Sequence, residues 1–430
     1  PILIALILRV LLFFYVVLYN PSFMIQPDSP SYINPAENLL NHGVFAKGSY
    51  PDLEPETVRT PGYPLFIALS YLLLGNRAES VIVLQVILGA LFPILAWKIM
   101  EELGASLRVR RLSAYLVALD PLLLIYTVNV LTEELYAFAI AILILLYLKV
   151  LKGTSPLYLY LASFLSGFQA YIRPIGMFLP ALIFLYFLFL KRFKEALIIL
   201  LISYLVILGW SYRNYEKTGA FEFSTISGAS MAFYRAAYVL QFETGESWVK
   251  IQEELKRKVE ERSCGMSEAQ KLALAKKMGL KIVLSHPLSA IKASFNGALG
   301  ILSGSGGAYY LVAFKAYKPG SGILNNKLYE LGFLRFLATL WAEYRTVFLV
   351  NLLLGFYFLF LYIASLFGFW KNILRAECWL LVIIILYFLV ISAGPEAYSR
   401  FRVPFELSLI VLSSLAFERR DKSSTGLFLS

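Results

Sequence analysis

Three carboxylates stand where predicted membrane helices begin or end. Asp28, in the stretch MIQPDSPSY, follows the first hydrophobic run, and Glu133 and Glu134 form the TEEL turn before a later one. Carboxylates are costly near a bilayer and indicate function when they gather. With two such acids, one can act as the base that activates a hydroxyl group. The other can orient the acceptor or, together with the base, hold a divalent cation. We therefore take Asp28 and Glu133 as candidate catalytic residues, and as the metal ligands if a cation is used.

Each of these acids also has a structural explanation. The stretch PDSPSYINPAENLL is typical of a helix start, so that Asp28 or Ser29 could be its N-cap. Glu133 and Glu134 could stabilise the following helix because its dipole favours negative charge at the N-terminus. The sequence alone leaves both alternatives open.

Arginines at other predicted helix ends complement the acids. A planar guanidinium binds phosphate well, whereas a single arginine at such a place could simply snorkel to lipid headgroups. Several that converge from separate helices favour a site for an anionic lipid phosphate. The candidates are Arg59, Arg173, Arg213, Arg400 and Arg402, and we add four residues of the same or neighbouring motifs, Tyr63, Glu134, Asn214 and Tyr398.

The sequence offers few residues for a cofactor. The two histidines, His42 and His286, have no cysteine nearby, and Cys264 and Cys378 stand far apart, so we predict neither a zinc site nor a disulfide. The glycine-rich stretch GILSGSGGAYY has no Gly-Lys-Ser/Thr and is not a nucleotide P-loop, so we interpret it as a flexible loop that could close over a substrate. No certain cofactor is predicted, and a divalent cation stays open.

The composition determines which kind of scaffold must position these side chains. Of 430 residues, 59% are hydrophobic and 16% charged, with a mean hydropathy of +0.69, which is typical of a polytopic membrane protein. The net charge of +11 is mostly in short loops between hydrophobic runs, and no nucleic-acid-binding motif accompanies it. We therefore predict membrane lipids as partners, and no nucleic acid.

The hydrophobic runs predict an all-α polytopic membrane protein with about ten transmembrane helices, interfacial helices and a small helical insertion on the outer face. The positive-inside rule favours a threading in which the run 62–75 only dips into the membrane, because the basic loops then all face the cytoplasm. The predicted runs are 1–19, 62–75, 79–99, 112–127, 134–151, 157–173, 174–190, 196–212, 288–303, 344–369, 378–393 and 403–417.

This threading predicts three segments. Residues 1–212 form a catalytic transmembrane module with a first outer loop at 20–61, residues 213–343 form the outer helical insertion, and residues 344–430 form the last transmembrane helices and a short cytoplasmic tail. The insertion contains two amphipathic helices that break near Cys264–Ser267, with the i,i+4 pairs Glu253/Arg257 and Glu254/Lys258 on the first, and an interfacial helix at 288–303. The acids and the arginines then meet on the outer face of a plasma or inner membrane.

Several motifs together resemble the type C membrane glycosyltransferases, and above all the bacterial and archaeal relatives of protein O-mannosyltransferases and of lipid A aminoarabinose transferases. The resemblance rests on a first helix followed by PDSPSYINPAENLLNHGVF and RTPGYPLFIALSYLLLG, and on the later VLTEELYAF, YIRPIGMFLP, GWSYRNYEKTG and YSRFRVPF. Ser29 departs from the family, which often has a second acid there. The chain also lacks a large C-terminal soluble domain, so the sequence predicts against an oligosaccharyltransferase.

The resemblance implies a reaction. A polyprenyl-phosphate sugar gives its sugar to an acceptor hydroxyl of a lipid, glycan or protein, with inversion, while Asp28 acts as the base, Glu133 as the second acid, and the arginines hold the lipid phosphate. A transporter or flippase of a lipid-linked glycan is the alternative. A transporter typically has broken helices and polar groups at the bilayer midplane, whereas the polar groups here gather at one face. A structural subunit of an envelope complex is a third hypothesis.

Overall fold

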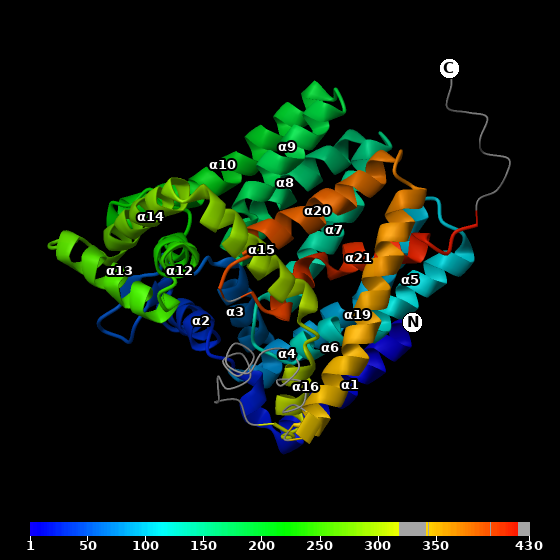
Figure 1. The fold of residues 1–430 in the computed structure, drawn as a ribbon, viewed down its shortest axis with the longest axis horizontal. Helices are drawn as coiled ribbons and strands as arrows, with labels where there is room; N and C mark the ends of the chain where they lie inside the picture. The colour runs from blue at the N-terminus through cyan, green and yellow to red at the C-terminus, as the bar shows by residue number, and fades with distance from the viewer. Residues whose placement is uncertain (318–340, 343, 396, 420–430) are drawn as a thin grey trace.

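Helices form almost all of the regular structure in the computed structural model, which describes residues 1–317, 341–342, 344–395 and 397–419 (Figure 1). Within these residues, five helices are long and apolar enough to cross a membrane: α1 (Ile2–Tyr19), α4 (Ala78–Glu102), α7 (Glu133–Leu151), α10 (Phe193–Thr218) and α19 (Arg345–Lys371). They confirm an all-α membrane protein. The predicted number of about ten spans stays a prediction.

Shorter helices account for the remaining hydrophobic runs. Two prolines explain why some runs do not form one continuous helix. Pro121 divides the run 112–127, and the side chain of Asp120 caps the second piece by accepting a hydrogen bond of 2.9 Å from the Leu123 amide. Pro174 likewise starts a short 3-10 turn. The helices are α3 (Gly62–Leu74), α5 (Leu107–Leu119), α6 (Pro121–Thr127), α8 (Pro156–Ile172), η2 (Pro174–Phe178), α9 (Leu179–Phe189), α20 (Ala376–Ser392) and α21 (Val403–Leu415).

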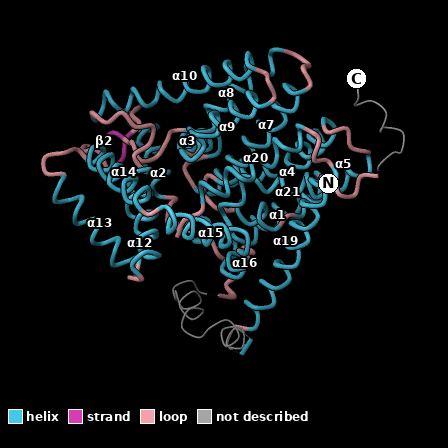
Figure 2. Tube along the Cα trace, turned by 45° about the horizontal axis from the view of Figure 1, so that its top comes forward, coloured by secondary structure: helices cyan, strands magenta, loops and turns pink. Residues whose placement is uncertain are grey.

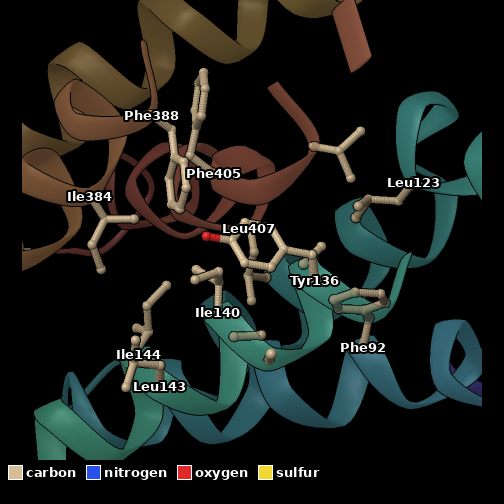
Figure 3. Close-up of a cluster of buried hydrophobic side chains, with 14 of the residues drawn as sticks. Phe92, Leu123, Tyr136, Ile140, Leu143, Ile144, Ile384, Phe388, Phe405 and Leu407 are labelled. Atoms are coloured by element: carbon tan, nitrogen blue, oxygen red, sulfur yellow. The ribbon is translucent and has the colours of Figure 1, made fainter. Parts of the chain in front are cut away.

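The core of the bundle lies around α7, which packs against α4, α8, α20 and α21 (Figures 1 and 3). Aromatic rings fill the layer nearest the start of α7. Tyr136 meets Phe388 of α20 edge to face, with ring centroids 5.7 Å apart, and Phe92 of α4 meets Phe138 in the same way at 5.6 Å. This packing fixes the first turn of α7, where Glu133 and Glu134 lie, against its neighbours.

Between α1 and α3 the first loop contains the 3-10 turn η1 (Pro21–Met24), the helix α2 (Pro30–His42) and a short antiparallel hairpin, β1 (Ala46–Lys47) with β2 (Glu54–Pro55). The hairpin lies beside α2 and α14 (Figure 2). Lys47 forms an ion pair with Glu268 of α14, so that the first loop is tied to the later insertion.

The described part of the predicted insertion consists of helices joined by short loops. Its two amphipathic helices are α13 and α14, which break where predicted, and a capping box of Ser267 and Gln270 starts the second. Of the two predicted pairs, Glu254 contacts Lys258 at 2.6 Å, whereas Arg257 turns forward to Glu261. The helices are α11 (Ile226–Ala229), the π-helix η3 (Ser230–Ala236), α12 (Ala237–Thr244), α13 (Trp248–Arg262), α14 (Glu268–Ser285), α15 (Pro287–Ser303) and α16 (Gly307–Ala313).

The glycine-rich stretch is not the free loop that the sequence predicted. Its first residues end α15 and its last ones begin α16. A Cβ at Gly300 would lie 2.9 Å from the Ala397 carbonyl oxygen, and one at Gly304 3.0 Å from Ser399. These glycines therefore let α15 pack closely against the segment that leads into the 3-10 turn η4 (Ser399–Arg402).

The division into three segments and the orientation in the membrane stay predictions. At a rise of 1.5 Å per residue, the 13 residues of α3 extend over about 20 Å, less than the hydrocarbon thickness of about 30 Å. This length agrees with a helix that dips into the membrane. The basic residues Arg420 and Lys422 of the predicted cytoplasmic tail, and 318–340 of the predicted insertion, lie outside the described residues.

A carboxylate–arginine cluster as the candidate active site

Hydrogen bonds join the loop between α1 and α3 to the turn that precedes α7. The amide of Val130 donates to the Met24 carbonyl at 2.8 Å, and the hydroxyl of Ser29 donates to the Val130 carbonyl at 2.7 Å. Ser29 is fully buried at this junction. Because Asp28 precedes Ser29 and Glu133 follows this turn, the junction brings the two acids to the same place.

Five of the predicted site residues form one network, which we call the carboxylate–arginine cluster. The two carboxylate oxygens of Asp28 accept separate hydrogen bonds, one from Arg59 at 3.1 Å and one from Arg400 at 2.9 Å. Arg400 also places its Nε 3.2 Å from Glu133 Oε1, and Arg173 donates to that same oxygen at 3.2 Å. Arg400 therefore bridges the two acids, and three guanidinium groups face two carboxylates.

The two acids differ in their access to solvent. The side chain of Asp28 is 34% exposed, while that of Glu133 is completely buried. A ligand that approaches from solvent can therefore reach the Asp28 carboxylate. Glu133 instead lies beneath Arg173 and Arg400, where a buried carboxylate holds guanidinium groups in a fixed position.

The arginines keep Asp28 ionised. Burial on its own raises the pKa of Asp28, but the hydrogen bond and charge of Arg400, together with the charge of Arg59, lower that pKa below its ordinary value. The same pairing acts in reverse on the arginine. Burial lowers the pKa of Arg400, and the negative charges of Glu133 and Asp28 more than offset this, so the pKa of Arg400 is raised.

Arg59 is held on every side of its guanidinium group. Its Nε donates to the Ser31 hydroxyl at 2.9 Å, its Nη1 donates to the Tyr32 hydroxyl at 3.0 Å, and the guanidinium carbon lies 4.4 Å from the centroid of the Tyr32 ring. Its backbone amide donates to the buried carboxylate of Glu56 at 2.8 Å. Arg59 is thus preorganised toward Asp28, and the turn around Glu56 positions it.

The proposed helix-cap role of Asp28 does not agree with the structure. The N-cap position of α2 belongs to Ser29, which makes no side-chain capping bond there, and the carboxylate of Asp28 turns away to the two arginines. For the other two acids, the alternative was that they interact with the dipole of the following helix. Their position agrees with it, because Glu133 and Glu134 occupy the first turn of α7.

Two of the predicted phosphate-binding arginines do not join the cluster. Arg402 is fully buried, where it forms an ion pair of 2.8 Å with Glu406 and donates to the Gly304 carbonyl at 3.0 Å. Arg213 donates to the carbonyls of Glu56 and Phe45 at 2.8 and 3.0 Å. The contacts of Arg402 lie within the bundle, and those of Arg213 lie at the base of the loop between α1 and α3.

The remaining candidates also contact the scaffold. The Tyr63 hydroxyl donates to Gln85 at 2.8 Å, and Asn214 donates to the Glu222 carbonyl at 2.9 Å. Glu134 is buried beside Arg9 of α1, whose Nε lies 4.0 Å from its carboxylate, so that this pair links α1 to α7. Tyr398 is 48% exposed just before η4, and its role stays a prediction.

The cluster does not fit a divalent cation. Arg400 places its guanidinium group between Asp28 and Glu133, so positive charge already occupies the position that a shared metal ion would take. Among the described residues, no group of three or more His, Cys, Asp or Glu side chains could hold a metal ion. We therefore derive no step through a metal.

Sequence reasoning missed three residues that build the cluster. Ser29 appeared as a possible helix cap and as a departure from a family pattern but not for its contact with Val130, and Glu56 carried no signal because it stands in an ordinary polar loop. Gly62 belongs to the RTPGYPLF motif, but nothing in the sequence indicated that this glycine is needed for helix packing. A Cβ there would lie 2.7 Å from the backbone of Tyr171, so glycine lets α3 pack against the end of α8, just before Arg173.

Comparisons with known proteins agree with the resemblance seen in the motifs. Residues 58–212 match the family model described as dolichyl-phosphate-mannose-protein mannosyltransferase. This region includes Arg59, Glu133 and Arg173 but neither Asp28 nor Arg400. No curated protein matches the chain at a significant level.

The fold is similar to that of an oligosaccharyltransferase from Archaeoglobus fulgidus in its apo form. The TM-score is 0.51 at 16% identity, over 96% of this chain and 49% of that one, so the chain spans about half the length of that enzyme. A second structure of that enzyme, tethered with an acceptor peptide containing the NVT sequon, gives a TM-score of 0.48 at 15% identity, over 90% of this chain and 45% of that one. The sequence predicted against an oligosaccharyltransferase, and at this identity the first match shows the fold alone. The family match over residues 58–212 and the similar fold both agree with a resemblance to the type C membrane glycosyltransferases.

Proposed function

We propose that the chain transfers a sugar from a polyprenyl-phosphate donor to an acceptor hydroxyl at the outer face of a cell membrane. The observation that carries this proposal is the bridge that Arg400 makes between Asp28 and Glu133. It leaves an accessible carboxylate beside guanidinium groups that outnumber the acids. Such a site suits an anionic leaving group next to a proton acceptor.

In the proposed reaction the acceptor oxygen attacks the anomeric carbon from the side opposite the phosphate. The new bond joins that oxygen to the sugar, the bond between the anomeric carbon and the phosphate oxygen breaks, and its electron pair leaves with the polyprenyl phosphate. Asp28 takes the proton of the acceptor hydroxyl. Arg400 and Arg59 stabilise the charge that grows on the leaving phosphate, and the configuration at the anomeric carbon inverts.

The paired state of Asp28 gives the donor a second role. A carboxylate whose pKa is lowered by two arginines is a weak base. The donor phosphate competes for the same guanidinium groups, and once they turn to it the pKa of Asp28 rises. In this scheme the base becomes effective only when the donor is bound, which limits unproductive chemistry in the free enzyme.

Glu133 takes a different part from the one the sequence predicted. Because its side chain is buried, we assign it to holding Arg173 and Arg400 in place rather than to touching the acceptor. Arg173 is further fixed between two aromatic rings, at 5.7 Å from the centroids of both Tyr136 and Phe401. This arrangement keeps the phosphate-binding groups rigid while Asp28 stays accessible.

The test uses the purified chain in lipid vesicles together with a total membrane-lipid extract, followed by mass spectrometry. We expect polyprenyl-phosphate sugars to be consumed and free polyprenyl phosphate to appear, while Asp28→Asn stops both. Asp52→Asn is the matched control, because Asp52 is an exposed acid of the same loop outside the cluster.

Two outcomes contradict the proposal. Movement of the lipid-linked sugar across the vesicle membrane without its consumption would identify a flippase, which was the alternative from the sequence. Equal consumption by the wild type and Asp28→Asn would remove Asp28 from the reaction even if the chain is a glycosyltransferase.

A further inference from the structure

An apolar groove with a basic rim lies between α5, α19 and the end of α21. Its volume is about 540 Å³. In Figure 1, α5 and α19 lie close together where the residues after α21 begin. The side chains that define the groove are Arg108, Arg111, Leu112, Tyr115, Phe360 and Phe417.

The groove lies at the opposite end of the bundle from the carboxylate–arginine cluster. Glu133 begins α7, and the 19 residues of that helix extend over about 28 Å. Near its far end, Lys149 forms an ion pair of 2.9 Å with Glu102, the last residue of α4, and α5 starts shortly afterwards at Leu107. The two features are therefore separated by about the hydrocarbon thickness of a bilayer.

Polar contacts hold one wall of the groove in place. The backbone amide of Ser106 donates to the Glu418 carboxylate at 2.9 Å, and Lys371 donates to the carbonyls of Ala416 and Glu418 at 2.9 and 2.8 Å. These contacts fix Phe417 between them, with its ring 6.4 Å from that of Phe360. The groove thus has a defined shape and is not a gap beside a loose chain end.

The three arginines of this region differ in their contacts. Arg110 donates to Glu101 at 3.0 Å and to the Ala105 carbonyl at 2.7 Å, so its guanidinium group is already paired. Arg108 and Arg111 are exposed at the rim, and they form no ion pair within the described part of the chain. Their charges are available to a ligand.

We infer that this groove binds an anionic phospholipid of the leaflet opposite the candidate active site. Arg108 and Arg111 contact the phosphate of the headgroup, and an acyl chain lies along Leu112, Tyr115 and Phe360. An exposed apolar wall alone would accept any lipid, but two unpaired arginines at its rim select a negative headgroup. This site is separate from the proposed donor site, and the inference does not depend on the proposed reaction.

The test measures retention of phosphatidylglycerol and phosphatidylcholine on the purified full-length chain by native mass spectrometry. We expect one phosphatidylglycerol to stay bound preferentially, and its affinity to fall by about thirtyfold in R108Q/R111Q, since each charge near a headgroup contributes about fivefold. R108K/R111K should keep most of the binding, because charge supplies most of the attraction. R77Q/R262Q is the matched control, as it removes two exposed arginines elsewhere.

The inference is overturned if the chain retains both lipids equally, because the groove then holds only the ordinary lipid boundary. It is also overturned if R108Q/R111Q binds phosphatidylglycerol as tightly as the wild type, or if the control variant loses as much. Both arginines are exposed, so their substitution leaves the packing of the core intact, and an unchanged melting temperature checks this.

Discussion

Asp28→Asn should lower turnover and, at the same time, strengthen the binding of the lipid phosphate. The substitution keeps the shape of the side chain but removes its charge and its ability to take a proton. If Asp28 is the base, turnover falls by about 10²- to 10⁴-fold. The same change frees Arg59 and Arg400 from two partly exposed ion pairs, each worth about 0.2–1 kcal/mol. A phosphate that competes for those arginines should then bind about 2- to 30-fold more tightly.

Two assays on the same preparation check these expectations. Sugar transfer gives turnover, and titration with polyprenyl phosphate gives the dissociation constant of the lipid product. The reasoning is refuted if Asp28→Asn retains near-normal turnover, or if it binds polyprenyl phosphate more weakly than the wild type. Asp52→Asn should change neither quantity, because it has the same chemical change outside the cluster.

The pH dependence supplies a further check on the same residue. Because the folded pKa of Asp28 is lowered below 3.8, the free enzyme keeps this base ionised down to at least pH 4, and its ion pairs contribute stability that is lost only as the pH falls through that lowered value. The profile of kcat/KM should therefore lack an acidic limb from Asp28 between about pH 5 and 8. The profile of kcat against pH should have its acidic limb at a higher pH. The reason is that the bound donor draws the arginines away from Asp28 and so raises the pKa of that carboxylate.

Three other perturbations test the scaffold and the site. Arg400→Gln should weaken binding of polyprenyl phosphate by about 10- to 150-fold through loss of a charged hydrogen bond worth about 1.5–3 kcal/mol, and unchanged binding would remove this arginine from the phosphate site. Gly62→Ala should destabilise the fold by about 1–3 kcal/mol because its Cβ meets the backbone of α8, whereas Gly209→Ala, with open space around it, should not lower the melting temperature. Cysteine labelling should reach Thr154→Cys only from inside the cell and Ser49→Cys only from outside, and labelling of both from the same side would mean that 62–75 spans the membrane.

Much of the secondary structure could be predicted because hydrophobic runs and prolines are local signals. The runs locate nearly all the apolar helices, and the break between α13 and α14 follows from Ser267 as an N-cap. The number of spans could not be derived in the same way. Helices of 11 to 17 residues can cross, dip or lie at the surface, and their neighbours decide which of these occurs.

The site could be predicted only in part. Residue type and position at a helix end placed Asp28, Arg59 and Arg400 among the candidates, and the structure brings these three side chains into contact. They could not separate Arg400 from Arg402, because the two are nearly adjacent and differ only in the direction that the 3-10 turn gives them. One faces Asp28, while the other points into the bundle toward Glu406.

The contacts that position the cluster could not be predicted from the sequence, because they join distant parts of the chain. The Ser29–Val130 bond joins residues 101 positions apart, and nothing in either local stretch specifies the other. Gly62 shows the same limitation, since its importance depends on how near the end of α8 comes to it. Such long-range contacts arise from packing, which a pattern read along one chain does not contain.

The most direct test of the central claim compares two lipids that differ only in their phosphate. Polyprenyl phosphate and the neutral polyprenol are titrated separately into the purified chain in vesicles, with the wild type and Arg400→Gln measured side by side. We predict that the phosphate form binds at least tenfold more tightly than polyprenol to the wild type, and that Arg400→Gln loses most of this preference. Equal binding of the two lipids, or an undiminished preference in Arg400→Gln, would contradict a phosphate site at the carboxylate–arginine cluster.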